Sequence, residues 1–158
     1  RGCLIALDRL ARRRIPSYVL DLGTGSGILA IAAAKTWPAP VVATDIDPVA
    51  AQTVRENAAG NGVAARIAAR AGPGFRPVAR MGRFDLVVAN IQARPLVELA
   101  GGMRRHITPG GTLVLSGLLS RQAPAVQAVY RARGFTLADR IRIGDWTTLI
   151  LRAPALSA

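Results

Sequence analysis

A glycine-rich turn near the start of the chain is the sequence feature that points most directly to chemistry. Positions 19 to 27 read VLDLGTGSG, with Asp21 before the turn and glycines at Gly23, Gly25 and Gly27. Glycines that follow a strand let a ligand approach the backbone closely, and the helix behind them presents free N–H groups. The turn therefore predicts a binding site for an adenosine-containing cofactor, and by itself it leaves open which one.

Two details of this turn separate the possible cofactors. The dinucleotide fingerprint G-x-G-x-x-G needs a glycine three positions after Gly25, and Ile28 stands there. In addition, Asp21 would repel a pyrophosphate and could pair with a cationic ligand. S-adenosylmethionine has no phosphate and carries a sulfonium and an ammonium. Asp21, Gly23 and Gly25 are therefore predicted to bind this cofactor, and a nicotinamide-dependent oxidoreductase is the disfavoured alternative.

A carboxylate that ends a second strand is expected to bind the ribose of the cofactor. Asp45 lies 22 positions after Gly23, where an acidic residue hydrogen-bonds ribose hydroxyls in Rossmann-like sites. Asp47 has a different explanation, because it precedes Pro48 and so has the position of a helix N-cap. We assign the ribose to Asp45 and the cap to Asp47.

An asparagine at the end of the expected fourth strand is the candidate catalytic residue. Asn90 ends the run Phe84–Asn90, beside the expected switch point of the sheet, where ligands bind. Its amide oxygen can accept a hydrogen bond from an amine and aim the amine's lone pair at a methyl group, which is catalysis by positioning. The alternative is an asparagine that only holds a loop.

These residues need a parallel sheet to bring them together. Short β-branched runs alternate with longer helical stretches, which indicates β-α-β units in a single domain, residues 1–158. Two alternating runs around Gly144-Asp145 predict an antiparallel hairpin. The expected fold is α/β, a Rossmann-like, mostly parallel twisted sheet with that hairpin at its C-terminal end. The expected strands are 19–22, 41–45, 66–70, 84–90, 112–116, 135–143 and 146–151, and the expected helices 3–11, 28–35, 48 to about 61, 95–107 and 122–133.

Several conspicuous residues have structural explanations. His106 in the last turn of a helix is expected to cap it, and Asp85 at the start of a strand is expected to be structural. Cys3 lies on an apolar helical stripe, and Trp146 is expected to fill the packing face of the hairpin. Thr108-Pro109-Gly110-Gly111 is typical of a turn.

Composition limits the other possibilities. The chain has 21 basic and 9 acidic residues, a net charge of +12, yet Lys35 is its only lysine. Such arginine enrichment is typical of compositional bias, and apart from Arg12-Arg13-Arg14 the arginines are scattered. Direct nucleic-acid binding is therefore possible but not favoured. One cysteine and one histidine exclude a disulfide framework and a His-Cys metal site. Without an apolar membrane-length run or a secretion signal, we expect a cytoplasmic monomer.

Taken in order, the motifs resemble class I S-adenosylmethionine-dependent methyltransferases and, more closely, the bacterial ribosomal protein L11 methyltransferase (PrmA) family. The resemblance covers nearly the whole chain. It rests on LDLGTGSGILAIAA from position 20, DIDP from 45, VANI from 88, LSGLL from 115 and GDW from 144.

The resemblance implies methylation of amino groups, the N-terminal amine and lysines, of a large-subunit ribosomal protein. It implies that positions matching Gly23, Asp45 and Asn90 hold the cofactor. A lysine amine has a pKa of about 10.4, so the acceptor must lose a proton before it attacks, and Asn90 is the candidate that orients it.

The chain departs from the family pattern in three respects. The family's N-terminal substrate-recognition domain and a Gly-Thr-Gly-x-His-x-Thr-Thr segment upstream of Arg1 are absent, and Gln92 replaces the usual leucine. No acidic residue follows the third strand, at Ala71, to meet the adenine amine. The alternatives are a methyltransferase-like domain acting on RNA or another protein, and a catalytically silent fragment. Glutamine-methylating relatives would carry Asn-Pro-Pro-Tyr after the fourth strand; this chain has Asn90-Ile91-Gln92-Ala93 there, which argues against that activity.

Overall fold

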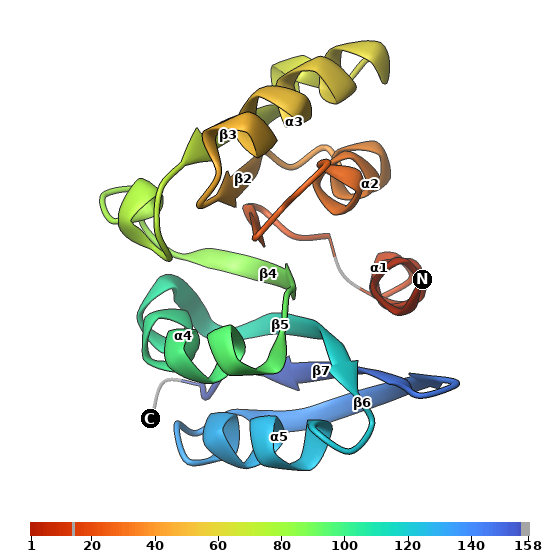
Figure 1. Cartoon of the computed structure of the whole chain (residues 1–158), viewed down its shortest axis with the longest axis vertical. Helices are drawn as coiled ribbons and strands as arrows, with labels where there is room; N and C mark the ends of the chain where they lie inside the picture. The colour runs from red at the N-terminus through yellow and green to blue at the C-terminus, as the bar shows by residue number, and fades with distance from the viewer. Residues whose placement is uncertain (14, 156–158) are drawn as a thin grey trace.

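Seven strands form one mixed sheet in the computed structural model, which describes residues 1–13 and 15–155 (Figure 1). The order across the sheet is β3-β2-β1-β4-β5-β7-β6. The strands are β1 (Val19–Leu22), β2 (Val41–Asp45), β3 (Ile67–Ala71), β4 (Phe84–Asn90), β5 (Ile107–Leu119), β6 (Thr136–Ile143) and β7 (Trp146–Arg152). The helices are α1 (Gly2–Ala11), α2 (Ile28–Thr36), α3 (Pro48–Gly60), α4 (Ala93–His106) and α5 (Ala123–Arg131), with 3-10 turns at Ala64–Arg66 and Arg76–Val78.

Strands β1 to β5 run parallel, and β7 pairs antiparallel with both β5 and β6. This confirms the predicted α/β fold with its C-terminal hairpin. Strand order reverses at β1, which lies between β2 and β4, and an open α/β sheet binds ligands at the carboxyl ends of the strands beside such a switch point. The glycine-rich turn follows β1 at this edge, and Asp45 and Asn90 end β2 and β4 there.

Helices cover both faces of the sheet (Figure 1). Helices α1, α2 and α3 pack on one face, around a core that includes Leu7, Leu29 and Val54. Helices α4 and α5 pack on the other, where Leu96, Met103 and Tyr130 are fully buried. The Tyr130 hydroxyl donates to the Leu96 carbonyl over 2.8 Å, which satisfies its buried polar atom and joins the two helices.

The local signals of helix ends are confirmed. Asp47 is the N-cap of α3: its side chain accepts a hydrogen bond from the Val49 backbone N–H over 2.8 Å, with Pro48 in the first turn. His106 ends α4, where its Nδ1 lies 3.0 Å from the Gly102 carbonyl oxygen and its ring stacks on Phe75.

Two other structural expectations also hold. Asp85 accepts hydrogen bonds from the backbone N–H groups of Ser17 and Tyr18, which holds the segment that leads into β1. Cys3 is buried on the inner side of α1. None of the helices in the described part of the chain has the length and apolar character needed to span a bilayer.

Two expectations were wrong. Trp146 does not fill the core: 56% of it is exposed, because it begins β7 beside the hairpin turn, at the open carboxyl edge of the sheet. The stretch 108–111 lies within β5, which is longer than the expected 112–116. These turn-forming residues interrupt the strand instead of ending it: the β4–β5 register shifts between Phe84 and Leu86, opposite this stretch. Other expected bounds differ from the observed ones by one or two residues.

Candidate active site

The glycine-rich turn leaves the end of β1 and is fastened to β2. The backbone N–H groups of Gly23 and Thr24 both donate to the Thr44 carbonyl, over 2.8 and 2.9 Å. Gly23 has a φ of +72°, and a Cβ atom there would collide with Cγ2 of Ile91. Both the left-handed backbone and this close approach require glycine at position 23.

Asp45 ends β2 and faces the same turn. Its Oδ2 accepts a hydrogen bond from the Gly25 backbone N–H over 2.9 Å, and its Oδ1 accepts one from the Asp47 backbone N–H over 3.1 Å. Two oxygens offer about four lone-pair positions, so further acceptor capacity remains for a ligand's hydroxyl groups. The geometry holds Asp45 in one orientation before any ligand binds.

Asp21 lies beneath the turn and is only 1% exposed. Its Oδ2 accepts from the Thr24 hydroxyl over 2.6 Å and from the Ala30 backbone N–H over 3.0 Å, which joins the turn to α2. Within the described chain its buried Oδ1 has no hydrogen-bond partner. The pKa of Asp21 is raised to about 6, chiefly by burial; the hydrogen bonds from Thr24 and Ala30 oppose this rise, and the nearby charge of Asp45 adds to it.

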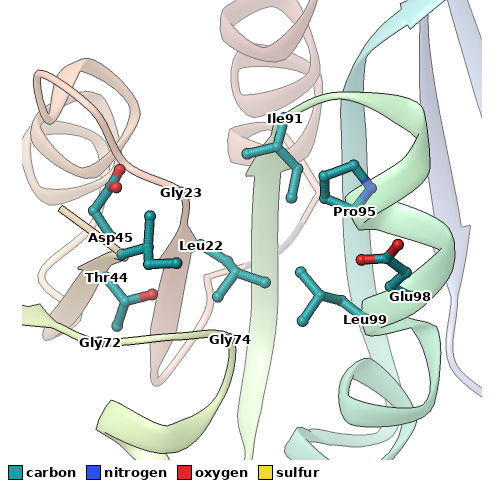
Figure 2. Close-up of a pocket in the computed structure, with 11 residues that line it drawn as sticks. Leu22, Gly23, Thr44, Asp45, Gly72, Gly74, Ile91, Pro95, Glu98 and Leu99 are labelled. Atoms are coloured by element: carbon teal, nitrogen blue, oxygen red, sulfur yellow. The ribbon is translucent and has the colours of Figure 1, made fainter.

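A cavity of about 410 Å³, the first cavity, opens at the carboxyl ends of β1 and β2 (Figure 2). Gly23, Thr44 and Asp45 line it, but Asp21 does not. The buried Thr44 hydroxyl has no hydrogen-bond partner among the described residues, so a polar ligand group would find one there. The remaining walls are Leu22, Ile46, Gly72, Gly74, Ile91, Pro95, Glu98 and Leu99.

Glu98 is a site residue that sequence reasoning missed. It projects from α4 on the wall opposite Asp45 (Figure 2), and its Oε1 accepts from Arg94 Nε over 3.0 Å. The sequence offers only an ordinary i,i+4 ion pair on a helix surface here. That pattern predicts exposure to solvent, and the Glu98 side chain is indeed 61% exposed, but the pattern does not indicate that the side chain borders a cavity. A carboxylate is thus present on the cavity wall, although none follows β3.

A second cavity of about 230 Å³ lies beside the first, at the ends of β4 to β7. Asn90 lines the second cavity and the next residue, Ile91, lines the first, so the two cavities flank the end of β4. The exposed Trp146 is part of this wall. The other lining residues are Arg1, Gly2, Ser116, Gly117, Ile141, Ile143 and Thr148.

Close packing fixes the backbone between the cavities. Gly117 has a φ of +79°, and a Cβ atom on it would lie 2.5 Å from the Ile91 carbonyl oxygen. Ser116 is in register with Asn90 and its hydroxyl is within 2.8 Å of the Thr148 hydroxyl. This geometry places a polar strand end, Asn90, at the junction of two cavities.

Comparison with known proteins decides the family. The model of the family described as "Ribosomal protein L11 methyltransferase (PrmA)" matches residues 1–154. This chain belongs to the PrmA family. Two relatives carry the name ribosomal protein L11 methyltransferase. The one from Bradyrhizobium diazoefficiens is 50% identical over 154 residues, which are 96% of this chain and 52% of the relative. The one from Brucella suis is 44% identical over 153 residues, 96% of this chain and 54% of the relative.

The chain spans about half the length of these PrmA relatives. Among solved structures, a ribosomal protein L11 methylase from Lactobacillus delbrueckii subsp. bulgaricus has a TM-score of 0.88 and 34% identity, covering 96% of this chain and 77% of that one. An RNA methyltransferase from Salinibacter ruber in complex with S-adenosyl-L-homocysteine has a TM-score of 0.76 at 21% identity, covering 98% and 92%. The second likeness shows a shared fold alone.

The residues expected to bind the cofactor divide between the two cavities. Gly23 and Asp45 line the first cavity, Gly25 bonds to the Asp45 carboxylate, and Asn90 lines the second. Within residues 1–13 and 15–155, no group of three or more His, Cys, Asp or Glu side chains is arranged to hold a metal ion.

Proposed function

We propose that this chain is the catalytic domain of an S-adenosylmethionine-dependent methyltransferase that acts on amino groups of ribosomal protein L11. Membership of the PrmA family supports the reaction and the substrate. The observation that carries the proposal is that consecutive residues, Asn90 and Ile91, line two separate cavities. A group transfer between two ligands needs such an arrangement, with one ligand on each side of a short junction.

The first cavity fits the cofactor. Its volume of about 410 Å³, the unpaired Thr44 hydroxyl and the approach to backbone at Gly23 suit an adenosine-containing ligand. Asp45 would accept hydrogen bonds from the ribose hydroxyls, and Gly25 would hold Asp45 in place. Glu98 would accept a hydrogen bond from the adenine amine, the role for which the sequence has no acid after β3. Asp21 acts from beneath, by fixing the turn to α2.

The second cavity fits the acceptor amine. When bound, S-adenosylmethionine supplies an electrophilic methyl group on its sulfonium, and the amine nitrogen gains that methyl as the carbon–sulfur bond breaks. The Asn90 amide oxygen accepts a hydrogen bond from one N–H of the neutral amine and so orients the lone pair of the amine nitrogen toward the junction. The apolar walls of Trp146, Ile141 and Ile143 disfavour a charged ammonium, so they lower the pKa of the amine and favour loss of its proton.

Calorimetric titration of the whole chain with S-adenosylmethionine tests the cofactor site. We expect Asp45→Ala to weaken binding about tenfold or more, because it removes the ribose acceptor and releases the Gly25 N–H. Asp8→Ala is the matched control, since Asp8 is an exposed carboxylate on α1 that lines neither cavity. NADH is the ligand control.

The outcomes of this titration are distinct. Loss of S-adenosylmethionine binding in Asp45→Ala but not in Asp8→Ala supports the cofactor site. Methyl transfer by the wild-type chain to ribosomal protein L11 supports the proposed reaction. Binding of NADH in place of S-adenosylmethionine favours an oxidoreductase. A folded chain that binds neither is a silent domain, and methylation of RNA in place of the ribosomal protein favours the RNA alternative.

A further inference from the structure

A third cavity lies on the face of the sheet covered by α1, at the opposite end of the strands from Asn90. Its volume is about 170 Å³, and its place beside Thr112, the first residue of β5 after the register shift, sets it at the amino edge of the parallel strands. We call it the basic cavity. Its lining includes Arg9, Arg13, Thr112, Asp139, Ile150 and Arg152.

Its four charged groups come from four different parts of the chain. Arg9 comes from α1, Arg13 from the segment just after α1, and Arg152 from the end of β7, while Asp139 comes from β6. Three guanidinium groups and one carboxylate leave two net positive charges around a small space. Arg9 Nη1 lies 2.7 Å from Asp139 Oδ2, and this hydrogen bond holds the pKa of Asp139 below its usual range.

The other two arginines retain donors for a ligand. Nη1 of Arg152 donates to the Thr112 hydroxyl over 3.0 Å and to the Gly110 carbonyl over 3.3 Å, which orients the guanidinium while its remaining N–H groups stay available. The side chain of Arg13 makes no hydrogen bond or ion pair with any described residue, and its charge helps to hold the pKa of Asp139 below its usual range. Its neighbour Arg12, in contrast, pairs with Asp8 over 3.4 Å.

We propose that the basic cavity binds a phosphate group. Guanidinium groups present paired N–H donors that match the oxygens of a phosphate, and they do so best where their orientation is already set. Two net positive charges balance a phosphate dianion, and the cavity has room for one tetrahedral group rather than for a nucleotide. The phosphate comes either from the backbone of an RNA or from a free phosphate ion.

Helix α1 connects this cavity to the candidate active site. Arg1 and Gly2 at its start line the second cavity, and Arg9 and Arg13 at its other end line the basic cavity. Ten residues of α-helix span about 15 Å. A ligand in the basic cavity therefore leaves the second cavity open, and the inference does not depend on the proposed methyl transfer.

The test is a titration of the whole chain with inorganic phosphate, followed by NMR of the arginine Nε–H groups. We expect phosphate to shift the signals of Arg9, Arg13 and Arg152, and Arg13→Gln to weaken binding about fivefold or more, because one guanidinium is worth about 1 kcal/mol or more to a bound anion. Arg131→Gln is the matched control. Like Arg13, Arg131 is an exposed arginine at or just after the end of a helix, and its side chain has no hydrogen-bond or ion-pair partner among the described residues. It belongs to α5, on the other face of the sheet.

A short single-stranded RNA without a terminal phosphate distinguishes the two sources. If Arg13→Gln weakens RNA binding and phosphate competes with the RNA, the ligand is an RNA backbone phosphate. If only phosphate binding is lost, the ligand is a free phosphate. Arg152→Lys provides a second variant, which keeps the charge and removes the paired donors, and it should also weaken binding.

Three results would overturn the proposal. The first is an absence of phosphate-induced shifts at these arginines. The second is equal weakening by Arg13→Gln and Arg131→Gln, which would indicate the diffuse attraction of a chain with net charge +12. The third is binding of acetate as tight as that of phosphate, which would indicate a carboxylate site.

Discussion

The two cavities that flank the end of β4 are built from different parts of the chain. The first cavity is shaped by the main chain: Gly23, Gly72 and Gly74 line it with φ angles of +72°, +147° and +53°. Among the lining residues of the second cavity only Gly117 has such a φ, and most of its wall is side chains from separate strands, such as Asn90 from β4 and Trp146 from β7. Backbone conformation therefore contributes more to the first cavity, and tertiary packing of the hairpin contributes more to the second.

The largest effect is expected from Gly23→Ala. The new Cβ combines a left-handed backbone with a collision against Ile91, so we expect a loss of about 3 kcal/mol in unfolding free energy and about a hundredfold in cofactor affinity. Gly25→Ala is the matched control, since Gly25 also has a positive φ but a Cβ atom added there would meet no other group within 4 Å. Urea denaturation and calorimetry measure both. Equal losses in the two variants would show that the collision with Ile91 is unimportant.

Asp21, which supports the first cavity from below, should make stability depend on pH. Its pKa is about 6 in the folded protein against 3.8 as the ordinary value, so the native state holds the proton more tightly than the unfolded state. The favourable contribution is complete below roughly pH 4, falls as pH rises, and is lost above roughly pH 6, a change of about 3 kcal/mol.

Asp21→Asn should remove this pH dependence. The unfolding free energies of wild type and variant, measured in urea across this pH range, should differ most at its acidic end in favour of the wild type. The difference cancels the titration of the other carboxyl groups. A difference that stays constant with pH would show that Asp21 ionises as in the unfolded chain.

Asn90→Ala should separate the cavities functionally. We expect the rate of methyl transfer to ribosomal protein L11 to fall about a hundredfold, while cofactor affinity falls less than about tenfold, because Asn90 lines the second cavity. Asn90→Asp keeps an oxygen acceptor and should recover part of the rate. Equal losses of rate and affinity would instead assign Asn90 to cofactor binding alone.

The smallest effect is expected from Trp146→Ala, which alters only the second cavity. The KM for the protein substrate should rise about tenfold without change in cofactor affinity. Stability should change by less than about 1 kcal/mol, because Trp146 is 56% exposed. Leu137→Ala, another exposed apolar residue of the same hairpin, is the control and should leave KM unchanged. An unchanged KM for Trp146→Ala would remove Trp146 from the acceptor wall.

Much of the fold was predictable because its signals are local. Strand β1 and the cap of α3 follow from a short apolar run and from Asp47-Pro48, each within a few residues. The turn signal at 108–111 was recognised, but its place inside β5 was not. The reason is that a strand can continue past an irregularity when its neighbour β4 still supplies hydrogen bonds on both sides.

The candidate site was predictable in part. Asp45 lies on the wall of the first cavity as expected, because it directly ends a strand whose carboxyl end must meet the switch point. Asp21 lies beneath that wall, because alternation along β1 turns its side chain toward α2. Glu98 was missed, since nothing local shows that one turn of α4 faces the cavity.

By itself, the sequence determined where the chain turns tightly, where α3 begins and in which order strands and helices alternate, since glycine conformation, capping and apolar runs depend on neighbouring residues. The tertiary structure alone decided that Asp21 is buried, that Trp146 is exposed, and that Asn90 and Ile91 line different cavities. Burial and cavity walls depend on residues that are distant in sequence, such as Gly23 against Ile91 and Ser116 against Thr148. Those contacts exist only once the sheet has assembled.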